Sequence, residues 1–267
     1  MRKYLSFFRI RFIAGLQYRA AAWAGVATQF AWGGLTILMY RAFYESGSNR
    51  FPMEFADLST YIWLQQALLS MYMLWFFDNE IFESITSGSI AYELCRPCDL
   101  YSMWFVKNMA IRLSKAALRC LPILLVAVFL PQPYGITMPA GVGAAVGFLI
   151  SMVLGFLVLI AFSMLIYISA FYTVSPTGMR ILSSSLTEFF AGAVIPIPFF
   201  PGWMQQIMNL LPFASIQSTP FLIYTGYFRA EAAWQSVAVQ LIWLVVLVGV
   251  GQLLMRKALR RVVVQGG

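Results

Sequence analysis

The sequence predicts an all-α polytopic membrane protein with six transmembrane helices, and three observations support this fold class. Of the 267 residues, 61% are hydrophobic and only 10% are charged, against about 25% charged residues in ordinary soluble domains. The mean hydropathy is +0.77. Several apolar runs approach the roughly 20 residues that a helical span needs. A soluble globular protein, a disordered chain and a disulfide scaffold are excluded, because so few charges would not cover this much apolar surface.

The chain begins with a basic amphipathic segment, residues 1–19. Arg9, Arg11 and Arg19 interrupt its apolar residues, so it lacks the continuous apolar region of a signal peptide. We expect a helix that lies in the cytoplasmic interface of the membrane; the alternative is a charged leader to the first span. At helical spacing the following residues share its apolar side: Tyr4, Leu5, Phe8, Phe12 and Leu16.

Six apolar segments follow and form a single transmembrane domain, residues 1–267, with no room for a large soluble domain. Pro131 and Pro133 mark the turn after the third segment, and Pro176 and Gly178 mark the turn after the fourth. The predicted spans are residues 20–43, residues 59–77, the end of an amphipathic stretch that stops near Leu130, residues 138–172, the segment from Arg180 to Pro196, and residues 233–254.

The formal net charge of +8 is unevenly distributed along the chain. With six spans, both termini lie on one side, and all Lys and Arg residues except Arg41, Arg50 and Arg229 fall in segments on that side. Because Lys and Arg accumulate in cytoplasmic loops, both termini are predicted to be cytoplasmic. The basic charge is explained by this bias, so no nucleic-acid partner is expected.

Several chemical functions are unsupported by the sequence. The chain has no G-x-x-x-x-G-K-[ST] motif, no histidine and no paired carboxylates within an apolar span, so we expect no catalytic residues and no nucleotide bound by this chain. Cys95 and Cys98 form a C-x-x-C pair, and Cys120 is the third cysteine. A closed zinc site needs four ligands, and we therefore predict no metal site.

A short amphipathic helix is predicted after the second span. Asp78 is suited to cap its N-terminus and Gly88 to end it. Ile81, Phe82 and Ile85 make one apolar face, and a helix this short needs something to pack against. From the pattern alone, that face packs either on the protein's own membrane side or in a groove of a soluble partner.

The segment between the fifth and sixth spans is apolar but rich in proline. Five of the twelve prolines lie between Glu188 and Gly226, and irregular backbone does not face lipid unsatisfied. The prediction is an external region, residues 196–226, with a short helix, Gly202–Leu211, that re-enters the outer leaflet. The alternative is an apolar external loop packed on the helices.

Glu188 is the clearest ionisable residue within a predicted span. It lies roughly 12 Å from the start of the fifth span at 1.5 Å per residue, with Ser184 one turn before it on the same face. An intramembrane acid marks either a functional site or a structural hydrogen bond between helices. The candidate substrate-path residues are Ser184, Glu188, Phe189, Phe199, Phe200 and Trp203.

The chain resembles the permease subunit of bacterial type-2 ABC exporters, in particular the short six-span kind without a large external domain. The layout of the whole chain is similar, and three motifs carry the resemblance. They are Gly88–Pro97 with its Leu-x-Arg-Pro ending, the external block from Phe200-Pro201-Gly202-Trp203 to Tyr224-Thr225-Gly226, and the C-terminal Val264-Gln265-Gly266-Gly267. The pair Cys95 and Cys98 is not a feature of that family.

The resemblance implies a dimer of permeases, two copies or one copy with a paralogue, in the inner membrane. Two separate ATPase subunits bind ATP and Mg²⁺, and the N-terminal helix and residues 78–100 contact them. Phe82 is then the expected anchor in an ATPase cleft. Family substrates include peptides, drugs, lipids and polysaccharides, and an amphiphilic or hydrophobic one is expected here. The ATPase-coupling residues implied are Asp78, Glu80, Ile81, Phe82, Glu83, Ile85, Gly88 and Arg96.

Two other functions remain open from the sequence. A secondary transporter or channel would work without an ATPase, although such carriers usually place several ionisable residues in their spans. A membrane-embedded scaffold or immunity protein is the third possibility. An ATPase that copurifies with the chain in mild detergent would favour the ABC exporter permease over these two functions.

Overall fold

The computed structural model describes residues 2–47, 51–173 and 175–261, and every regular element within them is helical. The C-terminal motif at residues 264–267 and Arg50 lie outside the described residues. The helices are α1 Arg2–Gly15, α2 Arg19–Glu45, α3 Phe55–Ala67, α4 Leu69–Tyr72, α5 Asn79–Thr86, α6 Ile90–Leu94, α7 Leu100–Phe129, α8 Val142–Ser169, α9 Thr177–Phe190, η1 Ile197–Phe199 (3₁₀), α10 Gly202–Leu210, α11 Ser218–Tyr224 and α12 Ala230–Leu259.

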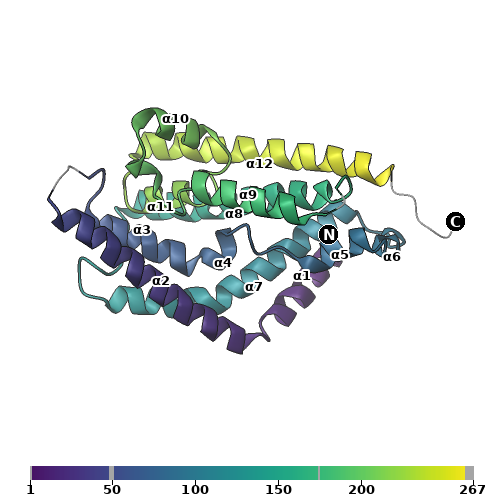
Figure 1. Ribbon diagram of the computed structural model, residues 1–267, viewed down its shortest axis with the longest axis horizontal. Coiled ribbons are helices and arrows are strands. Elements are labelled where there is room, and N and C mark those ends of the chain that lie inside the picture. Colours follow the sequence, from purple (N-terminus) through teal and green to yellow (C-terminus); the bar gives the residue numbers. More distant parts are fainter. Residues whose placement is uncertain (1, 48–50, 174, 262–267) are drawn as a thin grey trace.

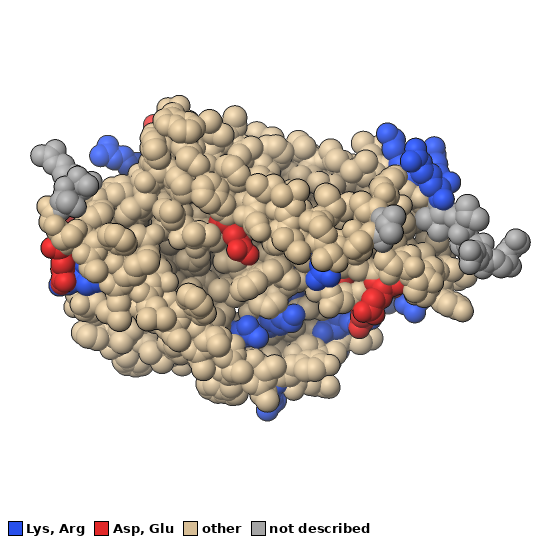
Figure 2. Space-filling model, viewed as in Figure 1, with Lys and Arg blue, Asp and Glu red and all other residues tan. Residues whose placement is uncertain are grey.

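The long helices run lengthwise through the molecule, with α8 at the centre (Figure 1). α8 packs against α7, α9, α11 and α12, while α1 lies along α7 and α2 packs on α3 and α7. One end of the molecule carries the start of α1, α5, α6 and the end of α12, and the opposite end carries α10 and α11 (Figure 1). The first end collects basic side chains from the last turns of α12 (Figure 2).

Two of the described helices are long and apolar enough to cross a membrane, Val142–Ser169 and Ala230–Leu259. α2 and α7 have similar lengths but fall outside this group because they are less apolar; α7 contains Lys107, Arg112 and Lys115. Each of the six predicted spans has a helical counterpart, namely α2, α3 with α4, the end of α7, α8, α9 and α12. The count of six crossings remains a prediction.

Two predicted spans differ in detail from the helices observed. The second, residues 59–77, breaks at Leu68 and leaves helical geometry at Met73; the Met73 and Phe76 carbonyl oxygens accept hydrogen bonds from Arg112 instead. The fifth ends at Phe190 because Gly192 has φ +73°, a left-handed conformation that terminates helices.

The external region, residues 196–226, contains two short α-helices and the 3₁₀ helix η1 rather than the single helix predicted. The predicted helix Gly202–Leu211 is present as α10, and its large apolar residues Trp203, Ile207 and Leu210 are exposed. The buried part is the segment that follows, residues 214–223, which includes α11 and packs on α8. The sequence pattern did not distinguish these two parts, because both are apolar and contain proline.

Gly155 allows the close approach of α8 to this buried segment. A Cβ at residue 155 would overlap the Ile216 carbonyl oxygen and lie 2.7 Å from the Ser215 carbonyl oxygen. Gly155→Ala is therefore expected to destabilise the protein by about 1–3 kcal/mol, because backbone must move. Thermal unfolding in detergent measures this, with Gly143→Ala as the control in the same helix, where a Cβ meets no atom within 4 Å. Equal stability of the two variants would contradict the packing described.

The N-terminal helix α1 forms as predicted, and its two sides have different environments. Tyr4 and Phe7 pack against the main core, whereas Leu5 is 71% exposed. The Lys3 ammonium donates to the Pro97 carbonyl oxygen at 2.7 Å, and the Tyr4 hydroxyl accepts from the Asp99 backbone N–H at 3.3 Å. α1 is therefore attached to the α6–α7 connection.

Candidate functional site

α5 has the boundaries that its sequence predicts. The Asp78 carboxylate accepts a hydrogen bond from the Glu80 backbone N–H at 3.0 Å and so caps the first turn. At the other end Gly88 has φ +77°, a conformation that costs glycine little and other residues more. The helix is followed at once by α6 and by the turn to α7.

The apolar face of α5 is buried within the protein itself. Ile81 and Phe82 are 1% and 4% exposed and belong to the main core. The Phe82 ring lies 4.9 Å from the Tyr167 ring of α8, and the Arg180 guanidinium of α9 lies 4.9 Å from the Phe82 ring centre. The Phe82 ring therefore packs on the protein's own helices, and its expected insertion into an ATPase cleft would require α8 and α9 to move away from this face.

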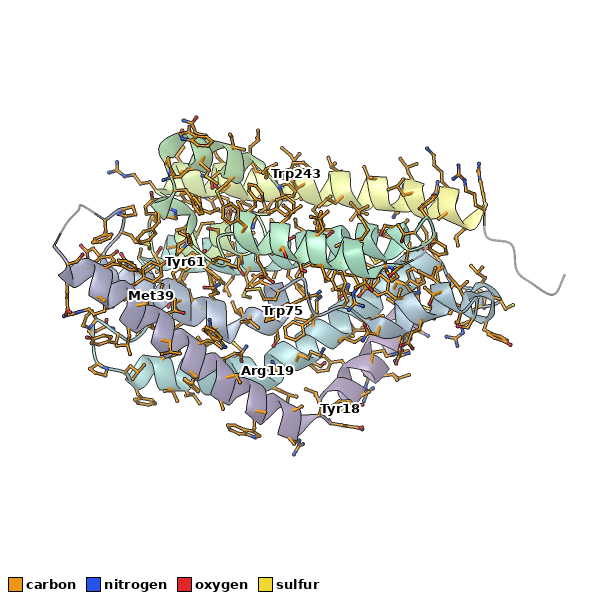
Figure 3. All side chains as sticks on the ribbon, in the orientation of Figure 1. Tyr18, Met39, Tyr61, Trp75, Arg119 and Trp243 are labelled. Carbon is orange, nitrogen blue, oxygen red and sulfur yellow. The ribbon has the colours of Figure 1, made fainter. Side chains whose placement is uncertain are left out.

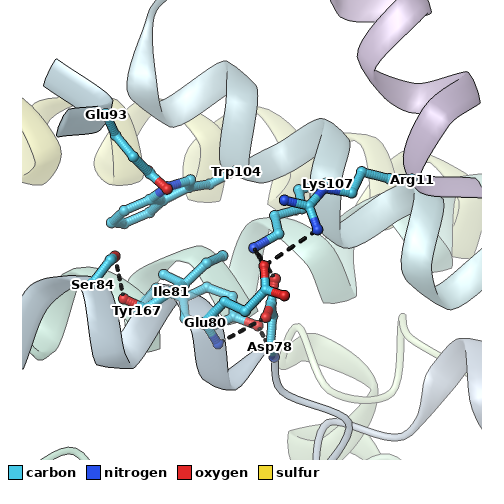
Figure 4. A network of polar contacts seen from close by, with 9 residues as sticks. All are labelled: Arg11, Asp78, Glu80, Ile81, Ser84, Glu93, Trp104, Lys107 and Tyr167. Carbon is cyan, nitrogen blue, oxygen red and sulfur yellow. Dashed lines mark hydrogen bonds and ion pairs between the residues drawn. The ribbon is translucent and has the colours of Figure 1, made fainter. Parts of the chain in front are cut away.

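The polar start of α5 is held by an ion-pair network (Figure 4). The Lys107 ammonium of α7 lies 2.7 Å from a carboxylate oxygen of Asp78 and 2.7 Å from one of Glu80. The Arg11 guanidinium of α1 lies 3.3 Å from the same Glu80 oxygen. The Asp78 backbone N–H donates to the Tyr167 hydroxyl at 2.7 Å. Four helices, α1, α7, α8 and α9, thus contact α5.

The electrostatic environment of Glu80 favours its ionised form. Hydrogen bonding and the positive charge of Lys107 lower the pKa of Glu80 below its ordinary value, with a smaller contribution from Arg11 in the same direction. A lowered carboxyl pKa contributes stability at neutral pH that is lost only as the pH falls through that pKa. Glu80 is therefore expected to stay ionised throughout the neutral range.

A buried guanidinium fixes the segment that leads into α5. Arg112 is 0% exposed. Its Nη1 donates to the Met73 carbonyl at 2.7 Å and its Nη2 to the Phe76 carbonyl at 3.1 Å. Its Nε donates to Asn108, which in turn donates to Ser163 of α8. α7 and α8 are thus connected to both the approach and the first turn of α5.

The outer side of α5 and α6 remains exposed, and we call it the coupling surface. Tyr92 is 78% exposed, although its neighbour Glu93 turns inward to accept a hydrogen bond from the Trp104 indole at 2.7 Å. Of the predicted coupling residues, Glu83, Gly88 and Arg96 lie on this surface, Ile85 is half-buried, and Ile81 and Phe82 lie beneath it. The coupling surface consists of Glu83, Thr86, Ser87, Gly88, Tyr92, Leu94 and Arg96.

A second feature, the central cavity, lies among α2, α3, α4, α7 and α9 and has a volume of about 850 Å³. Its lining includes Gln29, Trp32, Gln66, Trp75, Arg119 and Glu188. Arg119 and Trp75 lie near the middle of the molecule's long axis (Figure 3). The face seen in Figure 2 is hollowed there, beside an isolated acidic side chain.

Only one of the predicted substrate-path residues lines this cavity, Glu188. Ser184 donates to the Arg180 carbonyl of its own helix at 2.8 Å. Phe189 and Phe200 form an edge-to-face pair, Phe199 packs near Tyr40, and Trp203 is exposed on α10. These five side chains do not lie among the cavity's lining residues.

The basic residues around α5 and in the central cavity were not predicted as site residues. They are Lys107, Arg112 and Arg119, all from α7, and in the sequence they indicate only the orientation in the membrane. Their repeated occurrence in a mostly apolar helix was an available signal, because buried cations require partners. Cys95, Cys98 and Cys120 are free thiols.

The comparisons with known proteins give one match. A family model described as ABC-2 family transporter protein matches residues 30–266. The comparison with curated proteins gives no match. The matched range includes most of α2 and every later helix, and therefore α5, the coupling surface and the lining residues Gln66, Arg119 and Glu188 of the central cavity.

Proposed function

The chain belongs to the ABC-2 family of transporter proteins, and on that premise we propose that it is the permease subunit of an ATP-driven exporter. Two separate ATPase subunits bind ATP and Mg²⁺ and drive it, and a second permease, a copy or a paralogue, completes the assembly. The permease crosses the bacterial inner membrane six times with both termini in the cytoplasm. The cargo is an amphiphilic or hydrophobic molecule, and this chain itself has no catalytic role.

The observation that supports coupling best is the attachment of α5. Its inner face packs on Tyr167 and Arg180, and its first turn is ion-paired to Lys107 and Arg11. An ATPase bound at the coupling surface would move α5 together with α7, α8 and α9, because packed and ion-paired elements shift as rigid bodies. In this proposal the exposed side of α5 binds the ATPase, and the buried side of α5 transmits the movement to α7, α8 and α9.

Tyr92→Ala tests the exposed side. Tyrosine is enriched among residues that dominate binding at protein interfaces, where truncation commonly costs 2 kcal/mol or more. We expect at least a tenfold loss of ATPase affinity with normal thermal stability, measured as copurification from mild detergent. Tyr227→Ala, which alters a tyrosine in the α11–α12 connection at the opposite end (Figure 1), is the control and should copurify normally. Normal ATPase binding by Tyr92→Ala would remove Tyr92 from the interface.

The proposed orientation places Cys95 in the cytoplasm. Cys95 is exposed beside the coupling surface, whereas Cys98 and Cys120 are partly buried. In a Cys98→Ser, Cys120→Ser variant, a membrane-impermeant maleimide is expected to label Cys95 only after the cells are permeabilised. Labelling in intact cells would show that the orientation is inverted, and ATPase docking at this end would then be impossible.

A further inference from the structure

Two buried amide side chains in the central cavity have polar atoms without a hydrogen-bond partner among the described residues. Gln29 of α2 is 4% exposed, and neither its Nε2 nor its Oε1 has a hydrogen-bond partner within the described residues. Gln66 of α3 is 7% exposed, and its Oε1 likewise has none among them. Buried polar groups are almost always hydrogen-bonded in folded proteins. These amides therefore indicate a place where ligand atoms donate and accept hydrogen bonds.

The same cavity presents one acidic and one basic side chain that are not paired with each other. The Glu188 carboxylate makes no ion pair or hydrogen bond with any described residue. The Arg119 guanidinium has a long 3.5 Å contact from Nη2 to the Ala21 carbonyl, and its buried Nε has no partner in the described chain. Both side chains are half-buried, so a ligand that carries both charges can pair with them without breaking an existing ion pair.

The position of Arg119 depends on a glycine in the facing helix. A Cβ at residue 25 would lie 2.7 Å from the Arg119 Nη1 atom, so Gly25 leaves the space in which the guanidinium lies across α2. The rest of the lining is mostly apolar and includes Trp32, Leu69 and Met73, with Thr28, Thr36 and Gln65 as its further polar residues. The cavity thus combines an apolar wall with one anion-binding and one cation-binding group.

We propose that the central cavity binds an amphiphile that carries both an anionic group and an ammonium group on an apolar body. The anion pairs with Arg119, the ammonium pairs with Glu188, and Gln29 and Gln66 bond the polar atoms between them. A zwitterionic lipid headgroup and a hydrophobic peptide with free termini share this chemistry. The inference rests on the proposed function only in treating the occupant as transported cargo.

Binding to the purified full-length chain in dodecyl maltoside tests the proposal without an ATPase. The lipid arm compares lysophosphatidylethanolamine with lysophosphatidylglycerol, which lacks the ammonium, and with sphingosine, which lacks the anion. The peptide arm compares Leu-Trp-Leu with its acetylated and amidated form. We expect the doubly charged member of at least one arm to bind tenfold or more tightly than its controls, because each charge-assisted hydrogen bond contributes that much.

Substitutions at Arg119 and Glu188 test which residue binds the anionic group of the ligand and which binds its ammonium group. Glu188→Gln should reduce zwitterion affinity about tenfold to the level of the anion-only probe, and Arg119→Gln should weaken the zwitterion and the anion-only probe alike. Arg119→Lys, which keeps the charge, should restore part of the affinity. Gly25→Ala should weaken anion binding through the displaced guanidinium, while Gly34→Ala, where a Cβ meets nothing within 4 Å, should not. Glu231→Gln and Arg256→Gln on exposed α12 positions are the charge controls.

The outcomes separate this inference from the proposed function. Selective binding in the lipid arm or in the peptide arm alone identifies the source of the ligand. Equal binding of zwitterionic and singly charged probes, or unchanged affinity in monodisperse Glu188→Gln and Arg119→Gln variants, overturns the inference. If the zwitterion binds as expected but is not moved by an assembly that hydrolyses ATP, the binding site stands and its assignment to transported cargo is wrong.

Discussion

Lys107→Met is expected to destabilise the protein by about 3–5 kcal/mol, because removing one partner of a buried ion pair leaves the other charge uncompensated. Lys107 is 4% exposed, and the Asp78 side chain that it pairs with is 9% exposed. Glu80 is more exposed, at 64%, and contributes little, since exposed pairs are typically worth under 1 kcal/mol. The loss therefore comes mainly from Asp78 at the start of α5, and it should also uncouple ATP hydrolysis from transport.

A double variant distinguishes this charge effect from lost packing. Lys107→Met combined with Asp78→Asn removes both charges, so much of the lost stability should return. Lys257→Met, which alters an exposed lysine in the last turn of α12, is the control. Thermal unfolding in detergent and transport-coupled hydrolysis in proteoliposomes provide the two measurements. If the double variant is no more stable than Lys107→Met, the ion pair does not hold α5.

Phe82→Ala is expected to cost about 3–5 kcal/mol, the range observed when a buried aromatic side chain is truncated. It removes the ring that lies against Tyr167 and under Arg180, while the coupling surface keeps all of its side chains. The ATPase should therefore still copurify with the variant, but its hydrolysis should no longer drive transport. Phe82→Leu, which refills most of the volume, should restore much of both stability and coupling.

The control for this substitution is Phe129→Ala, because Phe129 is 83% exposed and its ring contributes little to the core. In the folded Phe82→Ala protein, two quantities are compared: the amount of ATPase that copurifies and the transport that ATP hydrolysis drives. Loss of ATPase binding at normal stability would show that Phe82 touches the ATPase directly, and the buried contact with α8 would then not be its role.

Local features of the coupling region were predictable from the sequence. Capping by Asp78 and termination at Gly88 depend on neighbouring residues, and both are confirmed. The partner of the apolar face was not predictable, because helical periodicity shows that Ile81 and Phe82 share a side but not what covers that side. Tyr167 is distant in sequence, and only the folded chain brings it to Phe82.

The same limit applies to the cavity and to the external region. Glu188 was identified from its depth in an apolar segment, but its counterpart Arg119 and the amides of Gln29 and Gln66 come from other helices. Hydropathy gave no means to tell buried α11 from exposed α10. Their difference arises from tertiary packing, where α8 admits the Ser215 and Ile216 backbone beside Gly155.

The central claim is that an ATPase docks on the exposed side of α5 and α6. The most direct measurement replaces Tyr92 by the photo-crosslinking residue p-benzoylphenylalanine in the full chain within native membranes and identifies the crosslinked partner by mass spectrometry. We predict a crosslink to an ABC ATPase subunit from position 92 and none from position 227 at the opposite end. If position 227 gives a crosslink to the ATPase and position 92 gives none, the ATPase does not dock on the exposed side of α5 and α6.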